Sequence, residues 1–407
     1  MMPLWVFLAV SAGAGDESLA IKAGRIIPIV GEELKDGIIL IRGGKIEAVG
    51  PGLDIPWNAR VIEAGDKTVM PGFVLAHTSG GLDRPNENLA EVPFVSAFDA
   101  LDPLSPFYED ALRDGITTLL VMPGNNTLIG GTGLIVKPCG RTVEAMLVKR
   151  QAGLKISLQP YQTNRMGHWA RLRQAFLELR EYLRERQEKI AEAQEKGDEA
   201  EVARWQEIDP KRQALVDLIE GRLPAFVYCP RASDVVHALE FMDEQKFKMV
   251  PVLGPECYKA AGLLAQRGLP AILDAQLITW EKDEETEQQE LRVIPQIFHQ
   301  AGVRLAFQIE PSAYGSRYLW FQAATAVKYG MPRSEALKAI TLYPAQMIGL
   351  GDRVGSIEKG KDANLLFLTG DPLDIRTWVD TVLIEGQVVY ERSKDERLQR
   401  LLTGERK

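Results

Sequence analysis

The side chains best suited to acid–base or metal chemistry are four histidines and the carboxylates that follow apolar runs. His77 comes directly after residues 73–76, an apolar run that predicts a buried strand. Glu310 comes shortly after residues 304–308, a second predicted strand. Because the carboxyl ends of the strands of a parallel barrel meet at one face, we expect His77 and Glu310 at the same face. The other histidines precede or lie within segments that predict helices: His168, His237 and His299.

This pair alone does not meet the needs of a hydrolytic metal site. Such a zinc site takes at least three protein ligands, mostly histidines with a carboxylate, and leaves one position open for water. Atypical ligands such as Cys229, Cys257, Glu256 or Asp83 would be needed to complete it. We therefore expect no cofactor, and a divalent metal such as zinc enters only in an alternative in which such ligands join His77.

Four further polar side chains are candidates for binding a small ligand. Arg84 follows the first predicted barrel strand, and Asn125 and Asn126 follow the second, so both loops are expected at the same face. Lys137 ends the predicted strand 134–137. Each candidate has an ordinary alternative, which is a surface ion pair for Arg84, a structural loop for the asparagines and a solvated strand end for Lys137.

The elements that must position these residues fall into separate groups along the chain. Residues 16–69 and 355–392 predict short strands separated by glycine-containing turns. Neither segment has enough strands to bury a face alone, so we expect them to form one composite β-sandwich. Residues 70–350 alternate between predicted strands and helices, which indicates a (β/α)8 TIM-type barrel. A charged helical insertion is predicted at about 167–217, and a charged tail at 393–407.

Several stretches resemble the amidohydrolase superfamily, whose members are metal-dependent hydrolases of C–N bonds. Pro71-Gly72, an apolar strand and then His77 resemble the family's first-strand motif, which ends in Asp-x-His-x-His. Here Leu75 stands in place of the aspartate, and Ser79 stands in place of the second histidine. Two later stretches are similar to the family's last barrel helices and C-terminal strands: 335–345 and 355–373.

The resemblance implies a degenerate metal site. In the family, two later barrel strands end in metal-binding histidines, and those ends here read Tyr228-Cys229-Pro230 and Gly254-Pro255-Glu256. Glu310 lies near the position of the family's catalytic aspartate, and Lys137 is the candidate for the bridging lysine that some members carry on a barrel strand. His77 then remains as the candidate metal ligand and Glu310 as the candidate catalytic group.

Two functions stay open from this resemblance. The first is a non-catalytic or strongly altered homologue, a pseudoenzyme, that binds a small polar ligand or pairs with an active paralogue; a homo-oligomer is the alternative assembly. The second is a working C–N bond hydrolase that uses His77 and Glu310 with atypical metal ligands or as a metal-free acid–base pair.

Composition limits the partners and the location of the chain. The net charge of −8 argues against a nucleic-acid binder, which needs a concentrated basic face. The three cysteines are far apart in sequence, so no disulfide is expected. Residues 1–15 combine an apolar run with small residues, which favours a signal peptide and export; since a positive n-region is missing, a plain tail of a cytoplasmic protein is the alternative. We expect no membrane span, because no apolar run is long enough.

Overall fold

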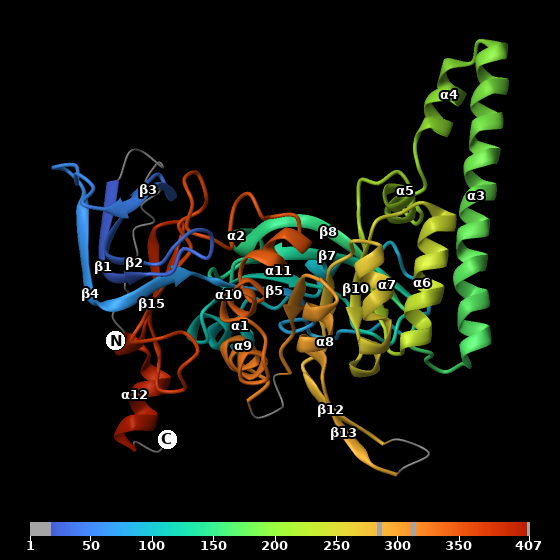
Figure 1. The fold of residues 1–407 in the computed structure, drawn as a ribbon. Coiled ribbons are helices and arrows are strands. Elements are labelled where there is room, and N and C mark those ends of the chain that lie inside the picture. Colours follow the sequence, from blue (N-terminus) through green and yellow to red (C-terminus); the bar gives the residue numbers. More distant parts are fainter. Residues whose placement is uncertain (1–17, 283–286, 311–314, 405–407) are drawn as a thin grey trace. The chain divides into compact units, whose positions relative to one another are not determined.

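The computed structural model describes residues 18–282, 287–310 and 315–404, and Figure 1 shows its fold. The expected signal segment 1–15 lies outside the described residues. The chain divides into two compact units. The first, here called the β unit, contains the chain up to Pro71, Ser356–Asp371 and the chain from Trp378 onward. The second, the barrel unit, contains Gly72–Gly355 and Pro372–Thr377.

The β unit is a seven-stranded sheet built from both ends of the chain. The strand order is β17-β16-β15-β4-β1-β2-β3, and β15 pairs antiparallel with β4. This pairing joins the early strands to the late ones. The strands form one continuous sheet rather than two separate sheets of a sandwich. Their bounds are β1 (Ser18–Ile26), β2 (Leu34–Arg42), β3 (Lys45–Pro51), β4 (Arg60–Pro71), β15 (Leu365–Leu368), β16 (Val379–Ile384) and β17 (Gln387–Glu391).

One hydrophobic core draws on strands from both ends of the chain in the β unit, namely β1 to β4 and the late strands β15 and β16. Ile21 and Ile39 come from the early strands, whereas Leu365, Phe367 and Leu383 come from the late ones, and all five are buried in the same cluster. Strand β2 alternates buried and partly buried positions from Gly37 to Ile41, as expected for a strand with one face toward a core. Because the core draws on both chain ends, neither end buries its apolar side chains without the other.

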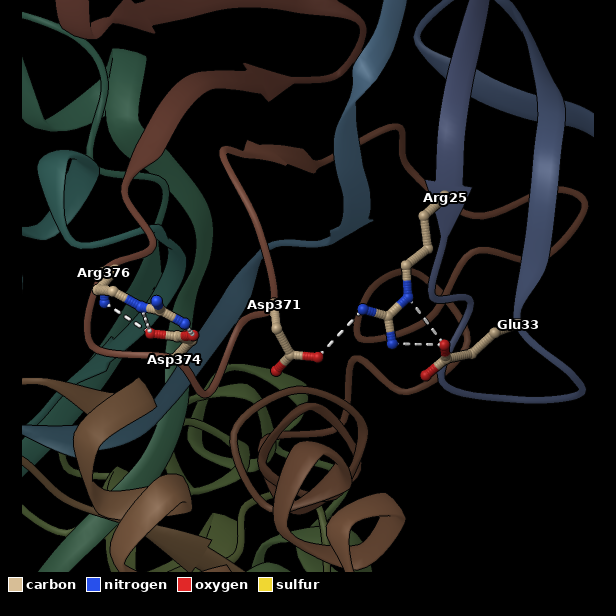
Figure 2. A network of polar contacts seen from close by, with 5 residues as sticks. All are labelled: Arg25, Glu33, Asp371, Asp374 and Arg376. Atoms are coloured by element: carbon tan, nitrogen blue, oxygen red, sulfur yellow. Dashed lines mark hydrogen bonds and ion pairs between the residues drawn. The ribbon is translucent and has the colours of Figure 1, made fainter.

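Polar contacts also join the two chain ends within the β unit (Figure 2). The Arg25 guanidinium donates to Glu33 Oε2 at 2.6 and 2.9 Å and to Asp371 Oδ2 at 3.0 Å. These side chains are about one-third exposed, so the network contributes on the order of 1 kcal/mol or less. Asp374 and Arg376, also drawn in Figure 2, form a separate local ion pair within 372–377.

The barrel unit contains an eight-stranded sheet in the order β14-β11-β10-β9-β8-β7-β6-β5. The two outermost strands, β5 and β14, contact each other, so the sheet is nearly closed into a barrel. The expected fold class, a TIM-type barrel with an additional domain, is confirmed. The strands are β5 (Phe73–Thr78), β6 (Ile116–Val121), β7 (Ile129–Val136), β8 (Leu147–Ser157), β9 (Ala225–Cys229), β10 (Met249–Leu253), β11 (Ala271–Leu273) and β14 (Leu305–Phe307).

One barrel strand runs against the others. Strand β7 pairs antiparallel with both β6 and β8, whereas the other strand pairs of the barrel are parallel. A parallel neighbour requires a crossover of a dozen or more residues, usually with a helix. Only residues 122–128 separate β6 from β7, and the short helix α2 (Val143–Met146) lies between β7 and β8. These connections are too short for crossovers, so β7 must turn back.

Helices connect most of the remaining strands. Helix α1 (Pro106–Arg113) connects β5 to β6 and begins with Pro106 after the Ser105 cap. The charged tail predicted at 393–407 contains helix α12 (Glu396–Thr403), which belongs to the β unit. No helix in the described ranges is long and apolar enough to cross a bilayer. The other barrel helices are α5 (Gln213–Ile219), α6 (Ala232–Gln245), α7 (Ala261–Gln266), α8 (Ile294–Gln300), α9 (Leu319–Lys328), α10 (Arg333–Lys338) and α11 (Leu342–Met347); β12 (Ile278–Lys282) and β13 (Gln289–Val293) form a hairpin.

The charged insertion forms a helical hairpin of α3 (Arg165–Lys196) and α4 (Glu199–Gln206). Gly197, with φ of +69°, ends α3 in a left-handed cap. The first half of α3 is anchored by aromatic contacts, since Trp169 and Phe176 pack edge-on against Phe241 of α6. Helix α4 has no buried residue. The hairpin is therefore part of the core at its base and solvated at its tip, which Figure 1 shows extending from the other helices of the barrel unit.

Replacing Arg184–Trp205 with a short Gly/Ser linker should leave the barrel folded. The removed segment includes one buried residue, Ala193, whereas the anchoring aromatic residues stay in place. We expect the free energy of unfolding in urea to change by less than about 1 kcal/mol. The matched control, Trp169→Ala, removes a buried anchor and should cost about 3 kcal/mol or more. Loss of cooperative unfolding in the linker variant would show that the tip belongs to the core.

Candidate functional site

His77 lies near the carboxyl end of the first barrel strand, β5, and is 5% exposed. The pairing of β5 with β6 shifts register between Leu75 and Thr78. Such irregularities re-aim side chains next to functional sites. The His77 ring contacts side chains from β8 and from the segment after β14. It therefore lies inside the barrel, at the face where the carboxyl ends of the parallel strands meet, here called the barrel mouth.

The two ring nitrogens of His77 are both engaged. Lys155 Nζ lies 2.8 Å from His77 Nε2, and Gln308 Oε1 lies 2.9 Å from His77 Nδ1. Gln308 Nε2 in turn donates to the Leu273 carbonyl at 3.2 Å. The bond from β5 to Gln308, directly after β14, connects the first and last strands of the barrel.

Lys155 has no charged partner in this network. It is fully buried in β8, and its register partner on the neighbouring strand is Phe226. In the part of the chain that the structure describes, no carboxylate pairs with its amine; besides the imidazole, the Tyr228 ring lies 5.6 Å from Nζ. A buried charge without a counter-ion is costly, so burial lowers the pKa of Lys155 to about 7.

The environment also fixes the protonation of His77. Burial, reinforced by the neighbouring Lys155, holds the pKa of His77 well below its usual range, against the opposing effect of the Gln308 hydrogen bond. A neutral imidazole donates from one nitrogen and accepts at the other. Gln308 Oε1 is an acceptor, so Nδ1–H donates to it, and Nε2 accepts from Lys155.

The donor set at the mouth does not fit a hydrolytic metal site. The ends of β9 and β10 supply Tyr228 and Gly254 rather than imidazoles, and the segment after β14 supplies the amide of Gln308. Within residues 18–282, 287–310 and 315–404, no group of three or more His, Cys, Asp or Glu side chains is arranged to hold a metal ion. Among these residues His77 is the only histidine at the mouth, and its Nε2 atom is hydrogen-bonded to Lys155, which has three N–H donors when charged.

Glu310 does not contact His77. It is exposed, and its backbone N–H donates to the Ser316 carbonyl at 3.1 Å. The expectation that Glu310 pairs chemically with His77 is corrected, because strand β14 ends at Phe307 and the side chain that turns toward the imidazole is Gln308. Glu310 acts instead on Asp274, whose pKa is raised by burial and further by the negative charge of Glu310.

Asn125 does reach the mouth. Ser157 Oγ, two residues beyond Lys155 on β8, donates to the Asn125 carbonyl at 2.6 Å. The Asn125 Oδ1 atom is buried without a hydrogen-bond partner among the described residues. A buried acceptor of this kind calls for a donor. Asn126 has a structural role through its backbone, which donates to Asn86 Oδ1 at 2.8 Å, and Arg84 is exposed.

Lys137 lies at the wrong end of the barrel for a mouth residue. It follows the carboxyl end of β7, and because β7 is antiparallel, this end lies beside the amino end of β8, where Val136 pairs with Leu147. The strand lysine at the mouth is Lys155, which sequence reasoning missed. A signal was present in the run Gly153-Leu154-Lys155-Ile156, where a lysine interrupts an otherwise apolar strand.

Comparisons with known proteins agree with this architecture. Residues 233–389 match the profile of the Amidohydrolase family. A solved amidohydrolase structure from Thermotoga maritima is 29% identical, with a TM-score of 0.82 over 92% of this chain and 100% of that one. Among curated proteins, amidohydrolase tasK of Hapsidospora irregularis is 23% identical over 87% of this chain, and the imidazolonepropionase of Thermoplasma volcanium is 35% identical over 25% of it. The chain covers 40% and 27% of the lengths of these two relatives.

The barrel, the composite β unit and these similarities define the class of protein. The profile match over residues 233–389, the similarity to tasK and the fold shared with the Thermotoga maritima structure support the assignment of this chain to the amidohydrolase superfamily. Its relation to the imidazolonepropionase covers one part of the chain only.

Proposed function

We propose that this protein is an altered amidohydrolase homologue that binds a small polar ligand at the barrel mouth without a metal and does not hydrolyse C–N bonds by the metal-dependent route. The observation that carries the proposal is the 2.8 Å contact between Lys155 Nζ and His77 Nε2. A metal ion needs the lone pair of a neutral imidazole nitrogen. Here the lone pair at Nε2 accepts from Lys155, and Nδ1 donates to Gln308.

The polar groups around Lys155 suit a ligand with both acceptor and donor atoms. A carbonyl or carboxylate oxygen would accept from the Lys155 amine, whereas an N–H or O–H group would donate to Asn125 Oδ1. Strand geometry places Ser157, which holds the Asn125 loop, about 7 Å beyond Lys155. A molecule of about four to six non-hydrogen atoms would extend over that separation.

Binding of polar probes tests this proposal. We expect acetamide, urea and acetate, measured by ligand-observed NMR, to bind in a saturable way that a chelator leaves unchanged. Lys155→Met should weaken the binding at least tenfold, because it removes the donor but keeps the volume. The matched control is Lys137→Met, which changes a buried lysine at the other end of the barrel and should bind as the parent does. Binding that disappears with chelator would contradict the proposal.

A second candidate function is a metal-free hydrolase of C–N bonds. It is supported by the pKa of Lys155 near 7, since a catalytic acid or base works best with a pKa close to the operating pH. The relatives named above are enzymes by their names, and this candidate takes from them only the general class of reaction, the hydrolysis of C–N bonds. Turnover of amides or cyclic ureas that survives chelator and is lost in Lys155→Met would favour this candidate over the first.

The assembly of this chain and its location in the cell are further parts of the proposal. Pairing with a paralogous amidohydrolase is one proposed assembly, and a homo-oligomer is the alternative. Export depends on residues 1–15, which lie outside the described residues.

A further inference from the structure

A cavity of about 120 Å³ that is open to solvent on one side lies at the end of the barrel opposite the mouth, and Arg304 and Gln346 in its wall are exposed. Two of its residues, Pro270 and Arg304, come directly before β11 and β14, so they mark the amino ends of these strands. The others lie on helix α11, which packs against β5 and β14. Its lining residues are Pro270, Arg304, Tyr343, Gln346 and Met347.

Arg304 brings a positive charge to this cavity without a paired carboxylate. Its Nη1 donates to Gln346 Oε1 at 3.2 Å, and no ion pair of Arg304 occurs in the described portion of the chain. Gln346 is neutral, so the charge is not offset. A guanidinium has five N–H donors, and this contact uses one of them.

The carboxylate that contacts the cavity residue Tyr343 is already occupied. Glu335 accepts from the Tyr343 hydroxyl at 2.7 Å and pairs with Lys338 at 2.9 Å. The Tyr343 proton is therefore committed to Glu335, and the charge of Glu335 is offset by Lys338. Arg304 is left as the cation on the cavity wall that is open to an anion.

The remaining wall is largely apolar. Met347 is 8% exposed and belongs to the hydrophobic core of the barrel, and Pro270 contributes an apolar ring. The volume is somewhat smaller than the roughly 150 Å³ of an apolar cavity that accommodates benzene. The cavity thus combines a cation at one side with space for a few methylene groups.

We infer that this cavity binds a short aliphatic monocarboxylate of about three to five carbon atoms. The carboxylate accepts two N–H groups of Arg304, in the planar bidentate geometry that guanidinium groups favour. The hydrocarbon chain packs against Met347 and Pro270. The site shares no residue with the His77 network, so it holds whether or not the mouth functions as proposed.

Titration with a homologous series tests the inference on the full-length protein. Propionate, butyrate and hexanoate are added while the ¹³C-methyl NMR signal of Met347 is followed. We expect saturable shifts with butyrate bound most tightly and hexanoate at least tenfold more weakly, because its chain exceeds the cavity. Propionamide and butyramide, which have the same shape without the charge, should also bind at least tenfold more weakly than the acids.

Two variants separate the charge from the shape of the site. Arg304→Gln should reduce butyrate affinity at least tenfold, and Arg304→Lys should reduce it less, since a point charge remains. Arg184→Gln, which makes the same change at an exposed arginine of the helical hairpin, should bind butyrate as the parent does. Equal binding of butyrate and butyramide, unchanged affinity in Arg304→Gln, or no saturable shift of Met347 would each overturn the inference.

Discussion

Replacing Lys155 with methionine should make the protein more stable at pH 6 to 7 and should remove a pH dependence that the parent protein shows. Burial lowers the pKa of Lys155 to about 7 from its ordinary value of 10.5. Between these two values the unfolded chain holds a proton that the folded chain lacks. Raising the pH through this window therefore stabilises the parent, and below pH 7 the dependence from this group vanishes.

The size of this effect follows from the shift. A lowering of about 3.5 units corresponds to an upper bound of about 5 kcal/mol across the whole window. Methionine carries no charge, so the free energy of unfolding of Lys155→Met should not rise with pH in this window. The variant should also lose about 1 to 2 kcal/mol of stability, because His77 Nε2 no longer has a hydrogen-bond donor. The parent should therefore overtake the variant as the pH approaches 10.

Urea unfolding at pH 6, 7, 8 and 9.5 measures both proteins under the same conditions. Lys137→Met is the matched control, because it removes a buried lysine at the other end of the barrel from His77. Parallel pH profiles for the parent and Lys155→Met would contradict the assignment of a buried, uncompensated amine to Lys155.

Ending the chain at Gly355 should unfold the β unit while the barrel stays folded. The truncation removes β15, β16 and β17, and with them the antiparallel partner of β4. It also removes Ile357, Leu365, Phe367 and Leu383 from the core of this unit. Loss of buried side chains of this size costs about 2 to 5 kcal/mol each, and the sum reaches the whole stability of a typical domain.

Amide hydrogen exchange distinguishes the two units in this experiment. Amides of β1 and β2 should lose their protection, whereas those of β9 and β10 should keep it, because the barrel core extends no further than Val354. Ending the chain at Asp395 is the matched control, since it removes only α12, which has no buried residue. Full protection of β1 after truncation at Gly355 would refute the shared core.

The composite architecture is readable in the sequence because its signals are local. Turn glycines and alternating apolar residues delimit strands at both ends of the chain, and two incomplete sheets can satisfy their edges by pairing. The direction of β7 is less evident, since it depends on the length of its connections rather than on the strand itself. For this reason the candidate Lys137 lies at the other end of the barrel from the mouth.

The hydrogen-bond partners of His77 are brought together by the fold, and residue spacing in the sequence does not reveal them. Lys155 follows His77 by 78 residues, and Gln308 follows it by 231. Glu310 is the more obvious acid in that segment, yet strand β14 ends at Phe307, three residues before it, and Gln308 is the side chain that contacts the imidazole. A lysine inside an apolar run of β8 was the remaining sequence signal. Its significance depends on the barrel bringing β8 and β5 together at the mouth.

Metal content measured by inductively coupled plasma mass spectrometry tests the central claim most directly. The protein is expressed with supplemental zinc, manganese and iron, purified without chelator, and compared with His77→Ala. The occupation of both imidazole nitrogens by Lys155 and Gln308 predicts less than about 0.1 metal ion per chain in both proteins, and a melting temperature that chelator leaves unshifted. One metal ion per chain in the parent, lost in His77→Ala, would contradict the account and indicate a metal-dependent hydrolase with atypical ligands.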